Sequence, residues 1–115
     1  MSTLKTNTIK NTDDVEMYLA KAWVNFNGTG TVAIRAAGNV SSITDNGTGN
    51  YTVNLTNAMP DTNYAYTANH ALYPGVIGWT FPFAVSTSSF SVITFGNASY
   101  TSYVDAGVVT AAIFR

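Results

Sequence analysis

Apolar residues recur at every second position along most of this 115-residue chain. The segment "YTVNLT" (51–56) shows the pattern most cleanly, because Tyr51, Val53 and Leu55 alternate with Thr and Asn. Alternation of this kind is typical of strands that face a core on one side and solvent on the other. The strands predicted in this way span residues 22–26, 31–36, 39–43, 51–56, 64–70, 75–81, 90–95 and 107–114.

Short runs rich in Gly, Asn, Asp and Pro separate these segments. In "TDNGTGN" (44–50) the Asn46–Gly47 step tolerates positive φ and indicates a hairpin, and Gly49 suits a bulge where the next strand begins. A calcium loop starting at Asp45 would need oxygen-bearing side chains where the chain has glycines. Short strands joined by such turns predict an all-β fold, an antiparallel β-sandwich of about eight strands.

The first 20 residues are mostly polar and differ from the rest of the chain. We expect residues 1–20 to form an N-terminal arm or attachment segment and residues 21–115 to form the sandwich domain. Within "DDVEMYLAKA" (13–22), Asp13 or Asp14 could cap a short helix, and an extended strand is the alternative.

The composition excludes several classes of function. Charged residues make up only 10% of the chain, against about a quarter in an ordinary domain, and the net charge is −1. The chain has 17 Thr, 12 Asn and 9 Ser, so neutral side chains supply its polarity. Its seven Tyr, six Phe and two Trp favour a folded core over disorder. Nucleic acids are bound mainly through clustered Lys and Arg, and the five basic residues here are scattered, so we expect no nucleic-acid partner.

The absence of cysteine excludes disulfides, thiolate metal sites and cysteine nucleophiles. No apolar run approaches the roughly 18 residues of a membrane span. The N-terminal stretch also lacks the apolar core of a signal peptide. We therefore expect no membrane partner, and synthesis in a cytoplasm.

The residues that could perform catalysis are scattered. His70 is the single histidine, and the acid closest to it in sequence, Asp61, lies across a proline-containing turn. The six acids lie in the N-terminal segment or in predicted turns, without a carboxylate pair typical of a glycosidase. Neither a Gly-x-Ser-x-Gly nor a phosphate-loop pattern occurs. We therefore expect that the protein is not an enzyme and that it has no cofactor and no metal site.

The segment "HALYPGVIGWTFPF" (70–83) concentrates aromatic residues. Rings beside Asn and Thr side chains can stack on sugars, and the same rings also suit a core or a subunit interface. If the protein contacts a receptor or glycan, we expect the contacts on loops at the end of the sandwich distal to the arm. The candidate contact residues are His70, Tyr73, Trp79, Tyr100 and Tyr103.

The last predicted strand, "VVTAAIF" (108–114), is apolar on both faces. A strand of this kind has to be covered on both faces, and a single sandwich covers only one face of each strand. We therefore expect a homo-oligomer with this strand or "AWVNF" (22–26) at the interface. The candidate interface residues are Trp23, Val109, Ala111 and Ile113.

Three long motifs follow one another in the first half of the chain: "KAWVNFNGTGTVAIRA" (21–36), "NVSSITDNGTGNYTVN" (39–54) and "AMPDTNYA" (58–65). Through them, residues 18–64 resemble a segment of tail-fibre and minor virion proteins of tailed bacteriophages, especially those of marine bacteria. The opening "LKTNTIKNT" (4–12) is similar to the segment that often precedes such modules.

The resemblance implies a virion structural protein made in the host cytoplasm, a small homotrimeric tail-fibre or tip module that contacts the host surface. Other virion proteins would then dock through residues 1–20. A capsid decoration or tail adaptor without a receptor is a second interpretation. The "MPDTNY" turn is similar to one in H-type lectins. This similarity implies a third interpretation, a lectin-like module whose partner is a host-surface glycan.

Overall fold

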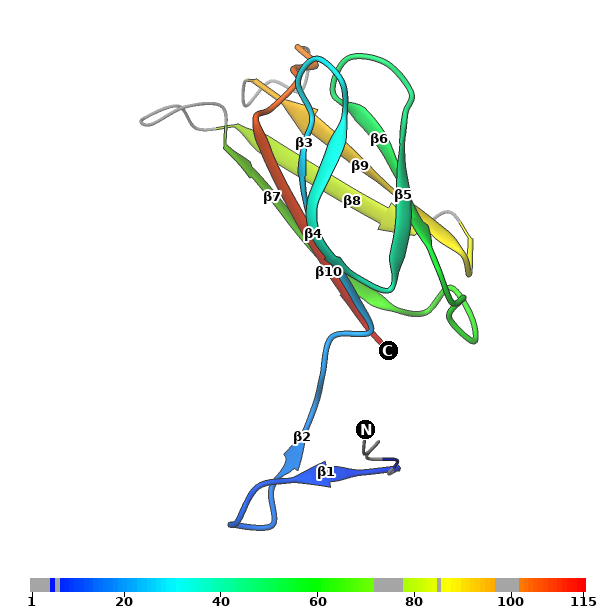
Figure 1. Ribbon diagram of the computed structural model, residues 1–115. Helices are drawn as coiled ribbons and strands as arrows, with labels where there is room; N and C mark the ends of the chain where they lie inside the picture. The colour runs from blue at the N-terminus through cyan, green and yellow to red at the C-terminus, as the bar shows by residue number, and fades with distance from the viewer. Residues whose placement is uncertain (1–4, 6, 72–77, 85, 97–101) are drawn as a thin grey trace.

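The computed structural model describes residues 5, 7–71, 78–84, 86–96 and 102–115 (Figure 1). Ten β-strands occur in this part of the chain, and no helix does. Eight of the strands form two sheets packed face to face. The predicted all-β antiparallel sandwich is confirmed.

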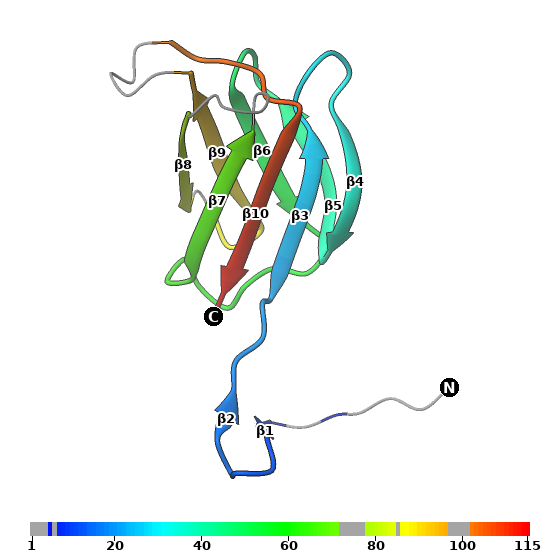
Figure 2. The ribbon, with the colours of Figure 1, turned by 90° about the vertical axis from the view of Figure 1, so that its left-hand side faces the viewer.

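The two sheets have four strands each. One has the order β4-β3-β10-β7 (Ala33–Gly38, Ala22–Asn27, Val108–Phe114 and Ala65–Ala71), and Figure 2 shows its outer face. The other has the order β5-β6-β9-β8 (Val40–Asp45, Asn50–Leu55, Ser89–Phe95 and Trp79–Ala84). Neighbouring strands are antiparallel throughout, as expected for short strands joined by tight turns.

The core lies between the sheets and follows the alternation of the sequence. Tyr51, Val53 and Leu55 of β6 are buried, and the residues between them are partly exposed. From the facing sheet, Phe26 of β3 packs its ring edge-on against Tyr51, with ring centroids 5.1 Å apart. Each large apolar side chain buried in this way contributes about 1.5–3 kcal/mol to folding.

The stretch that joins β5 to β6 is a tight turn, as predicted. The carboxylate of Asp45 accepts the N–H of Gly47 at 3.0 Å, and the N–H of Asn46 donates to the carbonyl of Asn50 at 2.9 Å. Gly47 and Gly49 both adopt positive φ. A side chain on Gly49 would lie 2.6 Å from the Thr94 carbonyl, so glycine is required there by space as well as by conformation.

A buried polar network joins three segments at the end of the sandwich away from the arm. The Tyr51 hydroxyl lies 2.9 Å from the Gly28 carbonyl and 3.0 Å from Oδ1 of Asp105. Gly49 also donates its N–H to Asp105 at 2.9 Å. Burial, and then the Asp105 carboxylate, raise the pKa of Tyr51 far above its ordinary value. The network therefore holds a neutral tyrosine between the two sheets.

The N-terminal residues form a short hairpin of β1 (Ile9–Lys10) and β2 (Glu16–Met17), which projects from the sandwich (Figure 1). Of the two alternatives for residues 13–22, the short helix is wrong and the extended strand is found at β2. The Asn11 carboxamide accepts the N–H groups of Asp13 and Val15 and so stabilises a turn, and Asp14 has a φ of 64°, outside the right-handed helical region.

The predicted interface is wrong for Val109, Ala111 and Ile113. These three residues are on the inner face of β10 and are buried in the core. The reason is the position of β10 at the centre of its sheet, between β3 and β7, which places its inner face against the second sheet. Its outer face carries Val108 and Phe114, which are exposed.

Removing the hydroxyl of Tyr51 tests the buried network. The Tyr51→Phe variant should lose about 1–3 kcal/mol of unfolding free energy, because the Gly28 carbonyl and the Asp105 carboxylate lose a buried partner. Urea unfolding measures the loss. The control, Tyr18→Phe, removes a hydroxyl from a ring that is 79% exposed and should change stability by less than about 0.5 kcal/mol. Equal losses in the two variants would contradict this account.

An ion pair at the other end of the sandwich should make stability depend on acid pH. Arg115 donates to both carboxylate oxygens of Asp61, at 2.9 and 2.7 Å, and with the Asn63 N–H it lowers the pKa of Asp61 from 3.8 to about 2. Because the folded-state pKa lies below the unfolded one, the pair stabilises the fold above about pH 4, and this contribution disappears as the pH falls to 2.

In the Arg115→Gln variant, NMR titration should show the pKa of Asp61 raised toward its ordinary value, with the Asn63 N–H still holding it below, and the acid-dependent loss of stability between pH 4 and 2 should shrink. The control is Lys10→Gln, which removes an exposed cation that pairs with Asp14 instead. If Asp61 titrates alike in the wild type and in Arg115→Gln, the ion pair does not form in solution.

Candidate functional site

The structure describes three of the five predicted contact residues, His70, Trp79 and Tyr103. Tyr73 and Tyr100 lie outside the described residues. Trp79 and Tyr103 are exposed and both lie beside Phe95 of β9. His70 lies within β7 instead of on a loop.

His70 connects the edges of the two sheets. Its Nδ1 lies 2.6 Å from the hydroxyl of Thr80 on β8, and a side chain at Gly78 would collide with its Nε2. Burial lowers the pKa of His70 below its ordinary value, so the ring is neutral at pH 7. The expectation that His70 contacts a ligand from an exposed loop is wrong, because its ring bonds to the neighbouring strand.

Trp79 and Tyr103 belong to a larger aromatic surface on the outside of the β5-β6-β9-β8 sheet. Along β8, every second side chain points outward, and Trp79, Phe81 and Phe83 are each 40–44% exposed. Phe95 of β9 packs edge-on against Phe81, with centroids 5.8 Å apart, and stacks with Tyr103 at 4.9 Å. We call this surface the aromatic face; its members are Trp79, Phe81, Phe83, Ile93, Phe95 and Tyr103.

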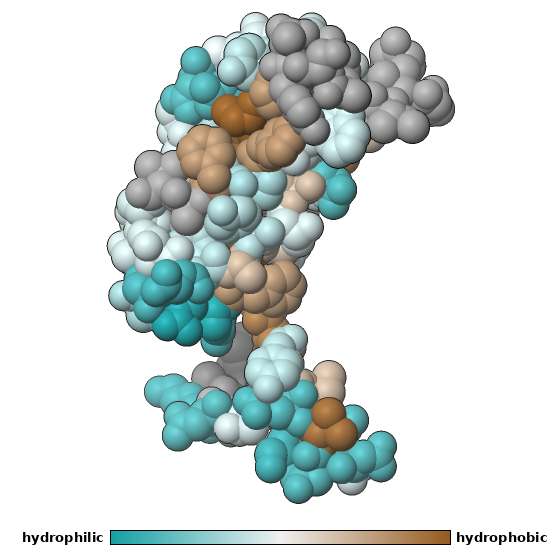
Figure 3. Space-filling view, turned by 180° about the vertical axis from the view of Figure 1, so that it is seen from behind, coloured by the Kyte–Doolittle hydropathy of each residue, from teal (hydrophilic) through white to brown (hydrophobic). Residues whose placement is uncertain are grey.

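The aromatic face has no charged residue on either of its strands, "WTFPFA" and "SFSVITF". Figure 3 shows hydrophobic residues gathered on the upper part of the sandwich in the view from behind. The sequence prediction ended the strand at residue 81, whereas β8 continues to Ala84 through Pro82. Proline is accepted there because β8 is an edge strand with a partner on one side only.

The outer face of the opposite sheet is chemically different. A shallow depression of about 340 Å³ crosses β3, β10 and β7, on the face turned to the viewer in Figure 2. Trp23, 45% exposed, is its one aromatic residue, and most of the lining is apolar, with the amide and hydroxyl side chains of Asn25, Thr67, Asn69 and Thr110 among it. The residues that line it on the outer face are Trp23, Asn25, Thr67, Asn69, Thr110 and Ala112, and Val24 and Ala111, whose side chains face the core, lie beneath it.

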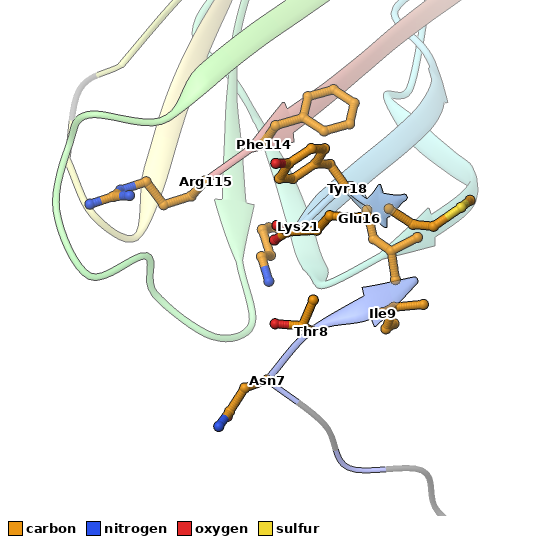
Figure 4. Close-up of a pocket in the computed structure, with 10 residues that line it drawn as sticks. Asn7, Thr8, Ile9, Glu16, Tyr18, Lys21, Phe114 and Arg115 are labelled. Atoms are coloured by element: carbon orange, nitrogen blue, oxygen red, sulfur yellow. The ribbon is translucent and has the colours of Figure 1, made fainter. Parts of the chain in front are cut away.

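A second hollow, of about 470 Å³, lies where the arm meets the sandwich (Figure 4). Apolar residues of the arm line one side of it, and Phe114 and Arg115 at the end of β10 line the other. The arm residues that line it are Asn7, Thr8, Ile9, Glu16, Met17, Tyr18 and Leu19, and Lys21 at the start of the sandwich domain lines it too.

The aromatic face, the depression at Trp23 and the hollow at the arm are surfaces suited to contact with another molecule. Within the described ranges, no group of three His, Asp or Glu side chains could hold a metal ion. The described part of the chain also holds no helix of the length and apolar character needed to cross a membrane.

The comparisons with known proteins give no relative. No protein-family model, no curated protein and no solved structure matches the chain.

Proposed function

We propose that this chain is a structural protein of a tailed-phage virion, a small fibre or tip module that assembles with copies of itself. The resemblance of residues 18–64 to tail-fibre and minor virion proteins supports the class of protein, and it implies a trimer. A capsid decoration or tail adaptor would use the same contacts at another position on the particle. The observation that carries the proposal is the aromatic face.

The aromatic face favours association because it exposes several large rings side by side. Contiguous apolar surface of this kind marks interaction sites on proteins, whereas single exposed apolar residues are ordinary. Aromatic residues are also enriched at the centres of protein interfaces, where charged residues are depleted. Neither β8 nor β9 contains a charge.

A second copy of the chain is the partner that fits this face. The net charge of −1 gives little repulsion between copies. A rotation axis beside the face would bring the same rings of neighbouring subunits together, as closed symmetric oligomers require. Pro82 has no backbone N–H, so the edge strand β8 lacks one hydrogen-bond donor. This disfavours extension of the sheet from one copy to the next along their edges, and favours copies that pack through their faces.

The arm supplies a second contact surface, for other virion proteins. Ile9, Met17, Tyr18 and Leu19 are 36–79% exposed, and they line the hollow between the hairpin and the sandwich. A segment of another protein that fills this hollow would cover them and fix the hairpin against the sandwich (Figure 4). This geometry supports attachment through residues 1–20.

The wild-type protein should sediment as an oligomer at micromolar concentration. A charge placed on the aromatic face should weaken it, because like charges would then meet in an apolar contact. We expect Phe83→Asp to raise the dissociation constant about tenfold or more in equilibrium sedimentation. Phe83 is 44% exposed, so the monomer should keep its β-rich circular dichroism spectrum.

Val108→Asp is the matched control, because Val108 is 38% exposed on the outer face of the other sheet. It should leave the oligomer intact. A wild-type monomer at micromolar concentration would contradict assembly, and dissociation by Val108→Asp alone would place the interface on β10.

Mass spectrometry and antibody labelling of purified phage particles that encode the chain test the virion assignment separately. Absence from those particles would refute it.

A further inference from the structure

The depression on the outer face of β3, β10 and β7 has features of a ligand site that assembly through the aromatic face does not use. Its volume, about 340 Å³, lies near the lower end of the roughly 300–1,000 Å³ of small-molecule sites. It is built on three adjacent strands, so its side chains are held by the sheet and not by loops. A small ligand could bind there without disturbing the second sheet.

The strand register arranges the side chains of the depression in two rows. Trp23, Ala112 and Thr67 are opposite one another on β3, β10 and β7, and so form the first row. Asn25, Thr110 and Asn69 form the second row, two residues along the same strands. Neighbouring strands are about 4.8 Å apart, and residues on one face of a strand are about 7 Å apart. The array therefore covers the area of one or two sugar rings.

Trp23 is positioned to offer a flat apolar surface. Its indole lies across Gly38 of β4, where a side chain would collide with Nε1 and lie 2.9 Å from Cδ1. Glycine at this position lets the indole rest on the sheet, and 45% of Trp23 stays exposed to solvent. A ring supported on one side and open on the other can stack on the C–H face of a pyranose at small entropic cost.

The polar groups around Trp23 are free to bind. The side chains of Thr67, Asn69 and Thr110 make no hydrogen bond within the part of the chain that the structure describes. Asn25 accepts a long contact of 3.5 Å from Arg35 through its oxygen. The depression thus presents neutral donors and acceptors beside one aromatic ring, and no carboxylate lines it.

This chemistry favours a sugar over a second copy of the chain. An apolar protein surface laid on the depression would bury unpaired amide and hydroxyl groups, each at a cost of about 1–3 kcal/mol. The hydroxyls of a sugar would pair with them. We propose that the depression binds a neutral carbohydrate, with a pyranose stacked on Trp23 and its hydroxyls bonded to Asn25, Asn69 and Thr110.

The test is an array of neutral hexose and N-acetylhexosamine oligosaccharides, followed by titration of the best binder by NMR. The wild type should bind at least one of them. Trp23→Ala should weaken binding about tenfold or more, Asn69→Ala should weaken it severalfold, and Trp23→Phe should retain part of it. Gly38→Val should also weaken binding, because it displaces the indole from the sheet.

Trp79→Ala is the matched control, since Trp79 is 44% exposed on the outer face of the opposite sheet; it should weaken self-association but leave the sugar's dissociation constant in the NMR titration unchanged. Each variant's circular dichroism spectrum and thermal melt check that it folds. The proposal is overturned if no neutral oligosaccharide binds the wild type, or if binding depends on Trp79 and not on Trp23. It is also overturned if Trp23→Ala dissociates the oligomer, since a second copy would then occupy the depression. None of these outcomes bears on whether the chain belongs to a virion.

Discussion

The packing of the two inner sheet faces against each other is the constraint on which the rest of the molecule depends. Tyr51 and Phe26 meet edge-on at the centre, and the hydroxyl of Tyr51 bonds onward to Gly28 and Asp105. Because side chains alternate across a strand, a slip by one residue would exchange every inner residue with an outer one. The core contacts that fix the register therefore also decide which side chains each sheet presents to solvent.

The two outer faces that result are chemically distinct. The β5-β6-β9-β8 sheet presents large rings without charge, a surface suited to covering by another protein. The β4-β3-β10-β7 sheet presents a single indole among neutral amides and hydroxyls, a surface suited to a polar ligand that carries an apolar face. With 10% charged residues in the chain, neither surface relies on ion pairs, so the proposed assembly and the proposed sugar binding would depend little on salt.

Local pattern was sufficient to predict the sandwich, the β5–β6 hairpin and the inward side of β6, since these depend on alternation and on turn residues that lie close in sequence. Features set by pairing between distant strands were predicted less well. The burial of Val109 and Ile113 follows from the central position of β10, and His70 of β7 is hydrogen-bonded to Thr80 of the other sheet. The predicted strand ended at residue 81, whereas β8 continues through Pro82, which an edge position tolerates. The depression at Trp23 needed the register of three strands, which the sequence does not contain.

The claim that the two faces have separate roles can be tested in one measurement on protein labelled with 5-fluorotryptophan, because the chain has two tryptophans, one on each face. Fluorine NMR follows both residues at once. The account predicts that dilution through the range in which the oligomer dissociates changes the chemical shift of Trp79 alone, and that adding a bound neutral oligosaccharide changes the chemical shift of Trp23 alone. The account is contradicted if both signals shift in the same titration, or if the protein concentration affects Trp23 and the oligosaccharide affects Trp79.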